Sequence, residues 1–332
     1  MACEATAYAR VGLVGNPSDG YNGKTISFTI GNFAAKVSLY NSPELEIVPS
    51  FQDRSKYPSV RDLVEDVKVH GYYGGIRLMK ATVRTFVHYC DEHGIELPPE
   101  NFSVRYRSNI PRHLGLAGSS ALVTATLRCL MEFYEVEIPK PVQPNVILSV
   151  EQKELDITAG LQDRVIQVYQ GCVYMDFDAD LMQAQGYGYY EHLDPDALPN
   201  LFIAYRTDLA EGSEVYHSNI RERWERGEPD VVQAMVDFAS YAEAVRDLLT
   251  QGRGGEIGPW LDKNFDRRRS ISNLDPKNID MIERARSAGA CCKFTGSGGA
   301  IVGTYEDEAM FQRIEQVFMG TRAEVVKPVI VE

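Results

Sequence analysis

The sequence lacks any apolar run long enough to cross a bilayer, and it is poor in cysteine. A membrane-spanning helix needs about 20 consecutive apolar residues, and no segment of the 332-residue chain reaches that length. The first ten residues include Glu4 and Arg10 and lack the apolar core of a secretory signal. The six cysteines do not have the spacing of metal ligands, and reduced thiols fit a cytosolic protein. We therefore expect a cytoplasmic protein that does not interact with membranes.

Positive charge is also scarce. The chain has 34 Lys and Arg residues against 47 Asp and Glu residues, a formal net charge of -13 at pH 7. This charge argues against non-specific binding to nucleic acid or to anionic membranes. An anionic substrate would need a local cluster of Arg or Lys. The hydrophobic content of 44% is ordinary for a globular protein, and the length allows two domains.

The order of predicted elements indicates an α+β protein. Strand-like segments of the first third, at 8–15, 25–30, 33–40, 44–49 and 102–110, predict an antiparallel or mixed sheet. Helical periodicity predicts helices at 75–90, 121–131, 142–155 and 158–168, and a further strand is expected at 171–177. The Pro-rich stretch 195–199 is the best candidate for a domain boundary.

Beyond that boundary the pattern changes to long helices alternating with strands. We expect strands at 201–205 and 323–330, and helices at 214–225, 229–250, 256–270, 276–288 and 306–319. A glycine loop at 296–299 lies between two strand-like runs. The chain therefore divides into an N-terminal domain (1–195) and a C-terminal domain (196–332).

A Gly/Ser-rich loop at 111–120 runs directly into an apolar helix. Val123, Leu127 and Leu130 recur there at helical spacing. A helix that is apolar over so much of its surface should be buried, and its free N-terminal amides and positive dipole end suit a phosphate. The loop alone equally fits an ordinary N-cap, with Ser119 or Ser120 capping a core helix.

Two common nucleotide motifs are excluded. Gly23-Lys24-Thr25 resembles the end of a P-loop, but that motif requires Gly where position 18 is Ser, and strand-like residues follow. No G-x-G-x-x-G opens a helix after a strand, so a dinucleotide-binding fold is not indicated.

The carboxylates at 151–163 could complete a phosphoryl-transfer site. Such a site needs phosphate donors, oxygen ligands for Mg²⁺, and a group that orients or deprotonates the acceptor hydroxyl. The candidates are Glu151, Glu154, Asp156 and Asp163. Asp163 lies in an otherwise apolar segment, so it is either capped and exposed or half-buried for a functional reason.

Three separated glycine-rich stretches together resemble the motifs of the GHMP kinases. Residues 115–121 (GLAGSSA) are similar to the second motif of that family, residues 10–15 with Asp19 and 21–23 to the first, and residues 294–300 (FTGSGGA) to the third. They occur in the family's order, so the resemblance covers essentially the whole chain. It implies a two-domain GHMP kinase fold, with an N-terminal ATP-binding domain of mixed sheet, a ferredoxin-like C-terminal domain and an active site in the cleft between them.

The resemblance also implies roles for individual residues. ATP phosphates would lie along Leu114, Gly115, Leu116, Ala117, Gly118, Ser119 and Ser120. Mg²⁺ would be bound by Ser120 or Ser119 and by Glu151, which precedes Asp163 by twelve residues. Asp163 would be the catalytic base, and Arg10 would hold it or neutralise the transferred phosphoryl group.

Within the family, the chain resembles the plant-type glucuronokinase branch. The stretches that carry this likeness include 15–19, 21–27, 215–218 with Arg221 and 223–224, and 264–270. The branch phosphorylates the anomeric hydroxyl of D-glucuronate with ATP. The implied substrate-binding residues are Asp19, Tyr21, Lys24, Arg268 and Gly298.

A uronate carboxylate independently calls for a cation, ideally a bidentate Arg. The candidates are Arg267, Arg268, Arg269, Arg206, Arg112 and Lys24, although each could instead lie on a solvated surface. For His113 and His217 we expect surface or capping roles rather than catalysis.

Two alternatives stay open at this point. The chain could be another GHMP small-molecule kinase, acting on galactose, arabinose, a heptose phosphate or mevalonate, or an inactive member that senses sugar and ATP. The expected partners are ATP and a small sugar or sugar acid, and the chain itself is expected to be a monomer or a homodimer.

Overall fold

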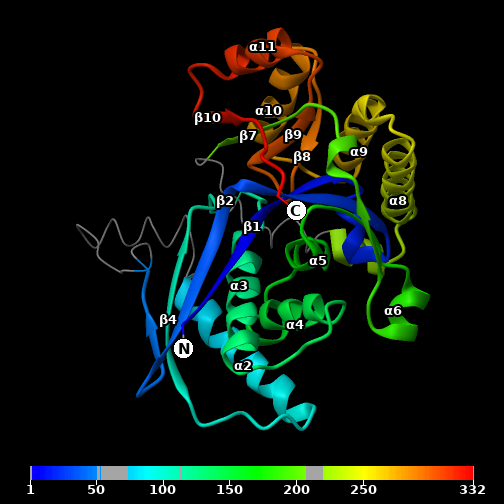
Figure 1. The fold of residues 1–332 in the computed structure, drawn as a ribbon. Coiled ribbons are helices and arrows are strands. Elements are labelled where there is room, and N and C mark those ends of the chain that lie inside the picture. Colours follow the sequence, from blue (N-terminus) through cyan, green and yellow to red (C-terminus); the bar gives the residue numbers. More distant parts are fainter. Residues whose placement is uncertain (1, 51–52, 54–73, 113, 207–219, 332) are drawn as a thin grey trace.

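The strands form two sheets that come from successive parts of the chain (Figure 1). The computed structural model describes residues 2–50, 53, 74–112, 114–206 and 220–331. The first sheet has six strands and the second has four. In the described part of the chain, no helix is both long enough and apolar enough to cross a membrane.

The long strand β2 is the centre of the first sheet. It pairs antiparallel with β1, β4 and β5, whereas β3 pairs parallel with β4, which makes the sheet mixed as predicted. The strands are β1 (Ala2–Val14), β2 (Lys24–Ser42), β3 (Glu46–Val48), β4 (Asn101–Ser108), β5 (Cys172–Asp176) and β6 (Tyr189–Leu193).

One prediction for this sheet is wrong. The expected strands 25–30 and 33–40 are one strand, because β1 pairs with β2 on both sides of the break, from Ile26 to Ile30 and from Ala34 to Tyr40, with a register shift between Tyr8 and Ala9. The stretch before the proline-rich boundary, for which the sequence pattern predicts no element, contains regular structure. It contains helix α6 (Ala179–Gln185), capped by the Asp178 side chain, and strand β6.

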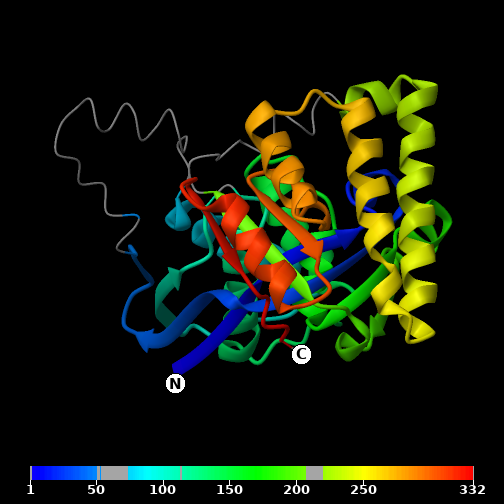
Figure 2. The same ribbon diagram turned by 90° about the horizontal axis from the view of Figure 1, so that it is seen from above.

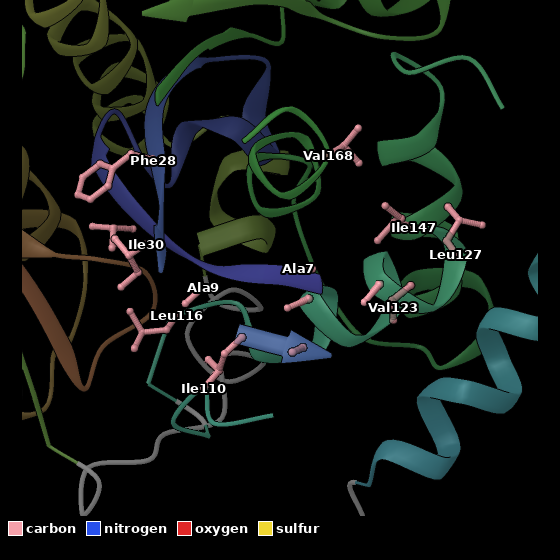
Figure 3. Packing of buried hydrophobic residues seen from close by; sticks show 14 of the residues in the cluster. Ala7, Ala9, Phe28, Ile30, Ile110, Leu116, Val123, Leu127, Ile147 and Val168 are labelled. Atoms are coloured by element: carbon pink, nitrogen blue, oxygen red, sulfur yellow. The ribbon is translucent and has the colours of Figure 1, made fainter. Parts of the chain in front are cut away.

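Helix α3 is the central helix of the N-terminal part. It packs on β1 and β2, and ten of its sixteen residues are buried. Figure 3 shows part of the hydrophobic cluster that results, with Val123 and Leu127 of α3, Ala7 and Ala9 of β1, and Leu116 of the preceding loop. Helix α3 spans Gly118–Phe133, and it is accompanied by α2 (Gly75–Glu92), α4 (Gln143–Ser149), the π-helical turn η3 (Val150–Glu154) and α5 (Gln162–Tyr169).

Helix α5 begins later than predicted. The sequence pattern places its start at Thr158, but the helix runs from Gln162. Asp156 has a positive φ of 55°, and the chain from 157 to 161 is not helical. As a result Asp163 lies in the first turn of α5 rather than in the middle of a helix.

The second sheet has the order β10-β7-β9-β8 and is antiparallel throughout. This is the strand order of a ferredoxin-like domain, so that prediction is confirmed. Its strands are β7 (Leu201–Arg206), β8 (Cys291–Phe294), β9 (Ala300–Thr304) and β10 (Ala323–Val326). Figure 2 shows α10 (Pro276–Ser287) and α11 (Glu308–Phe318) over this sheet, and α8 (Pro229–Thr250) and α9 (Gly258–Ile271) side by side next to it.

The last residues of the chain return to the first sheet. Val329 O accepts a hydrogen bond from Gly31 N at 2.7 Å, and Val331 O accepts one from Thr29 Oγ1 at 2.7 Å. The division into 1–195 and 196–332 stays a prediction, since these final residues bond to the N-terminal sheet. Of the predicted helix 214–225, only 220–225 lies within the described residues; the rest of it, the stretch 215–218 with His217, and His113 lie outside them.

Candidate active site

The three glycine-rich stretches meet at Gly115. Its carbonyl oxygen accepts hydrogen bonds from Arg10 Nη1 at 2.9 Å and from Thr295 Oγ1 at 3.2 Å. Gly296 packs so closely that an added Cβ would lie 2.4 Å from Gly115 O. The structure therefore brings together the first, second and third stretches, which are far apart in the sequence.

Arg10 pairs with Asp163. It lies near the middle of β1 with a side chain only 6% exposed, and its Nη2 is 2.5 Å from Asp163 Oδ1. Arg10 Nη1 also donates to Thr295 O at 2.6 Å, and the Arg10 backbone N–H donates to Leu116 O at 3.1 Å. The guanidinium is thus held by groups from both halves of the chain, and it fixes the position of the Asp163 carboxylate.

Glu151 lies at the N-terminus of α3. One of its oxygens, Oε1, accepts a hydrogen bond from Ser119 Oγ at 2.8 Å. The other, Oε2, accepts from Arg164 Nε at 2.9 Å and from Arg164 Nη2. Ser120 is buried and turns back to donate to Ala117 O at 3.2 Å. Of the two serines, the structure therefore brings Ser119, and not Ser120, to Glu151.

The backbone at the start of α3 can bind an anion. The first amides of a helix have no partner inside the helix, and they lie at the positive end of its dipole. Gly115 and Ala117 both adopt the left-handed conformation, with φ of 61°. These two residues turn the chain from the Arg10 contact at Gly115 into the first turn of α3.

Asp19 lies beside Asp163. Its Oδ2 accepts a hydrogen bond from the Gln162 backbone N–H at 3.3 Å, and a Cβ on Gly160 would lie 2.1 Å from the same oxygen. Burial, followed by the nearby Asp163 charge, raises the pKa of Asp19 to about 6. Two carboxylates thus face the same space, where a polyhydroxylated substrate can accept and donate hydrogen bonds.

The other predicted substrate residues have different surroundings. Arg268 is buried and donates to the carbonyl oxygens of Gly296 at 2.6 Å and Ser297 at 3.1 Å, so it supports the third glycine loop. Lys24 pairs with Glu243 and, at 3.3 Å, with Asp176, and it is not brought to Asp163.

Gly298 and Tyr21 complete the set of predicted substrate residues. Gly298 has a φ of 155° and packs on the side chain of Asn278. Tyr21 lies on the same 3-10 turn as Asp19, η1 (Ser18–Tyr21), and its ring contacts that of Trp224 with centroids 5.4 Å apart. Of the predicted substrate residues, Asp19 and Tyr21 therefore share one turn beside Asp163.

Sequence reasoning missed three polar residues that shape the site. Arg164 bonds Glu151, Lys293 donates to Gly12 O at 2.8 Å and to Asn16 Oδ1, and Asn264 accepts from Gly15 N at 2.7 Å. Each is at least nine-tenths buried. The available signal was a charged or amide side chain inside an apolar segment, which is uncommon unless it has a partner.

A divalent cation fits the oxygens at the start of α3. Among the described residues no group of three or more His, Cys, Asp and Glu side chains could enclose a metal. Ser119 Oγ and Glu151 Oε1 nevertheless offer two hard oxygens in contact. Mg²⁺ bound to a nucleotide typically takes only one or two protein ligands, with phosphates and water supplying the rest. The donor set therefore suits a nucleotide-bound cation rather than a permanently enclosed one.

Fold and site together define a small-molecule kinase with two α+β parts. The family model for the N-terminal domain of GHMP kinases matches residues 77–171. Two Arabidopsis thaliana proteins are similar over most of their length: "Probable glucuronokinase 2" is 46% identical over 90% of this chain and 83% of its own, and "Glucuronokinase 1" is 45% identical over 91% and 84%. The fold is similar to that of Lactococcus lactis galactokinase, solved in complex with galactose, with a TM-score of 0.78 at 13% identity, covering 99% of this chain and 93% of that one. The chain belongs to the GHMP kinase family.

Proposed function

We propose that the chain transfers the γ-phosphoryl group of ATP to the anomeric hydroxyl of D-glucuronate. The observation that carries this proposal is the Asp163 carboxylate, held by Arg10 at 2.5 Å and connected to the Ser119–Glu151 pair through Arg164, whose Nη1 lies 3.5 Å from Asp163 Oδ2. The similarity to two glucuronokinases over about nine-tenths of the chain supports the choice of sugar. The products are ADP, glucuronate 1-phosphate and a proton.

The phosphates of ATP would lie along 114–120, against the N-terminus of α3. Backbone amides there donate to phosphate oxygens without any rearrangement. Ser119 and Glu151 are the residues that would hold Mg²⁺, which supplies neutralising charge on the phosphates when bound. Arg164 keeps Glu151 in place through its two hydrogen bonds.

Asp163 would orient the sugar and accept its hydroxyl proton. The bond between the γ-phosphorus and the ADP oxygen breaks as the bond to the sugar oxygen forms, and the hydroxyl proton passes to Asp163. Arg10 stabilises the negative charge around the transferred group while it holds Asp163. Asp19 would bind a sugar hydroxyl from the neighbouring turn.

An assay that couples ADP formation to NADH oxidation tests this function directly. The panel contains glucuronate, galacturonate, galactose, arabinose and mevalonate, each with ATP and Mg²⁺. We expect the highest kcat/KM with glucuronate and identification of the product as the 1-phosphate by ³¹P NMR. Turnover of mevalonate or galactose without turnover of uronates would assign another substrate. Binding of ATP and sugar without ADP formation would instead indicate a sensor.

A further inference from the structure

The proposed substrate is itself negatively charged. A uronate carboxylate enters a site that already holds Asp163, Asp19 and Glu151. We propose that Arg221 binds this carboxylate and so determines the preference for a sugar acid. This inference rests on the proposed function.

The side chain of Arg221 packs against η1, the turn that carries Asp19. Its guanidinium carbon is 4.7 Å from the centre of the Tyr21 ring and 5.8 Å from that of Trp224. A Cβ placed on Gly20 would lie 3.6 Å from Arg221 Nη2. The aromatic rings hold the face of the guanidinium, and this contact leaves the N–H groups at its edge as donors.

The place of this turn suits a carboxylate of the same sugar. In a pyranose, the anomeric carbon and the carbon that bears the carboxylate both flank the ring oxygen. Asp163 would accept the proton of the anomeric hydroxyl. The group that binds the carboxylate must therefore lie on a segment close to Asp163. The turn satisfies this requirement, because Asp19 accepts from the Gln162 N–H and its pKa responds to the Asp163 charge.

Several other cations have oxygen partners that lie closer than the 4.0 Å contact of Arg221. Those with described partners are Arg10 with Asp163, Arg164 with Glu151, Lys24 with Glu243 and Asp176, Arg268 with two loop carbonyls, Arg267 with Asp237, and Arg112 with Asp53. Arg221 instead has a 4.0 Å contact with Glu225, between side chains that are 38% and 60% exposed. An exposed pair of this kind contributes little to stability, because water screens it. A substrate carboxylate can replace it at small cost.

The test compares glucuronate with its neutral amide, glucuronamide. The variants are Arg221→Gln, Arg221→Lys and, as a matched control, Arg253→Gln. Arg253 is also exposed and paired with a nearby glutamate, Glu256, but it immediately precedes η5 (Gly254–Glu256), beyond the C-terminal end of α8. Each glutamine variant removes one positive charge, so a general electrostatic effect would appear in both.

We expect Arg221→Gln to lower kcat/KM for glucuronate about 10- to 100-fold, the range for loss of charge-assisted hydrogen bonds. The loss should lie mainly in KM, whereas kcat, the KM for ATP and the constants for the amide stay at wild-type values. The amide is followed as a substrate or, where its turnover is slow, as a competitive inhibitor. Arg221→Lys should fall between, because an ammonium keeps the charge without the planar fork, and Arg253→Gln should match the wild type.

Two results would overturn the inference while leaving the proposed function intact. One is an Arg221→Gln enzyme with the wild-type KM for glucuronate. The other is an equal loss toward glucuronate and the amide, which would show that Arg221 only supports the turn. A wild-type enzyme that fails to phosphorylate glucuronate would overturn the proposed function itself, and this inference with it.

Discussion

Replacing Asp163 with Asn tests the centre of the proposed chemistry. The change removes the proton acceptor but keeps the shape of the side chain and one oxygen that can accept from Arg10 Nη2. General acid–base catalysis typically contributes about 10²- to 10⁴-fold, so we expect turnover to fall by that factor. On the free-energy scale this loss corresponds to a barrier increase of about 3–5 kcal/mol.

The effect on stability should be much smaller. Arg10 Nη1 keeps its hydrogen bonds to Gly115 O and Thr295 O, and these still hold the guanidinium in place. What is lost is the difference between a charge-assisted and a neutral hydrogen bond, about 1–2 kcal/mol. A domain with a typical stability of about 5–15 kcal/mol stays folded after such a loss.

The measurement is kcat in the coupled ADP assay at saturating ATP and glucuronate, with thermal unfolding recorded in parallel. Asp247→Asn is the control, because it removes the same charge from an exposed position on α8, and it should keep full turnover. Near-wild-type turnover of Asp163→Asn would remove Asp163 from the mechanism. A fall in turnover accompanied by a collapse of the thermal transition would mean that the pair with Arg10 is mainly structural.

Three further changes test the surroundings of this centre. The pKa of Asp19 is raised from 3.8 to about 6. Protonation of Asp19 therefore stabilises the folded state fully below pH 3.8. This contribution to the free energy of unfolding, about 2–3 kcal/mol, is lost as the pH rises through 6. Thermal unfolding between pH 4 and pH 7 should therefore show the wild type losing stability relative to Asp19→Asn, and parallel curves would contradict the assignment. Glu151→Gln removes the closer of two carboxylates that pair with the buried Arg164 and leaves Asp163 Oδ2 at 3.5 Å from its Nη1. This change costs up to about 3–5 kcal/mol. The Mg²⁺ concentration for half-maximal activity should rise at least about 10-fold, and an unchanged Mg²⁺ dependence would exclude Glu151 as a ligand. Gly115→Ala puts a Cβ 2.8 Å from a backbone nitrogen of the third glycine loop at a φ of 61°, so the KM for ATP should rise. Gly94→Ala has a similar φ of 66° in open space and should show only the backbone cost of about 1–2 kcal/mol.

Much of the framework could be predicted from the sequence because it depends on local patterns. The loop at 111–120 combines Gly and Ser with an apolar helix, and the structure shows that helix buried on β1 and β2. The ion pair of Arg10 and Asp163 was expected only through the resemblance to the GHMP kinases. Residues 153 positions apart carry no local signal of contact.

The parts that were missed depend on contacts between distant segments. Helix α5 starts at Gln162, where the backbone N–H bonds to Asp19, and no local propensity encodes that partner. The triplet 267–269 was among the candidates for a carboxylate ligand. Successive helical residues point about 100° apart, so the three arginines face different partners: Asp237, the carbonyls of the third glycine loop, and Glu283.

The role of the C-terminal half follows from the polar residues that it buries against the first motif. Asn264 of α9 bonds both to Gly15 N and to Asn16 O, and Lys293 of β8 donates to Gly12 O and Asn16 Oδ1. Both side chains are almost fully buried. If either side chain lost its hydrogen-bond partners, the cost in free energy would exceed what those hydrogen bonds contribute. The two side chains therefore favour a single arrangement of the first motif against α9 and β8. The C-terminal half therefore holds in place the loop that leads to Asp19. The turn to which we assign sugar recognition is thus fixed in position by buried residues of α9 and β8.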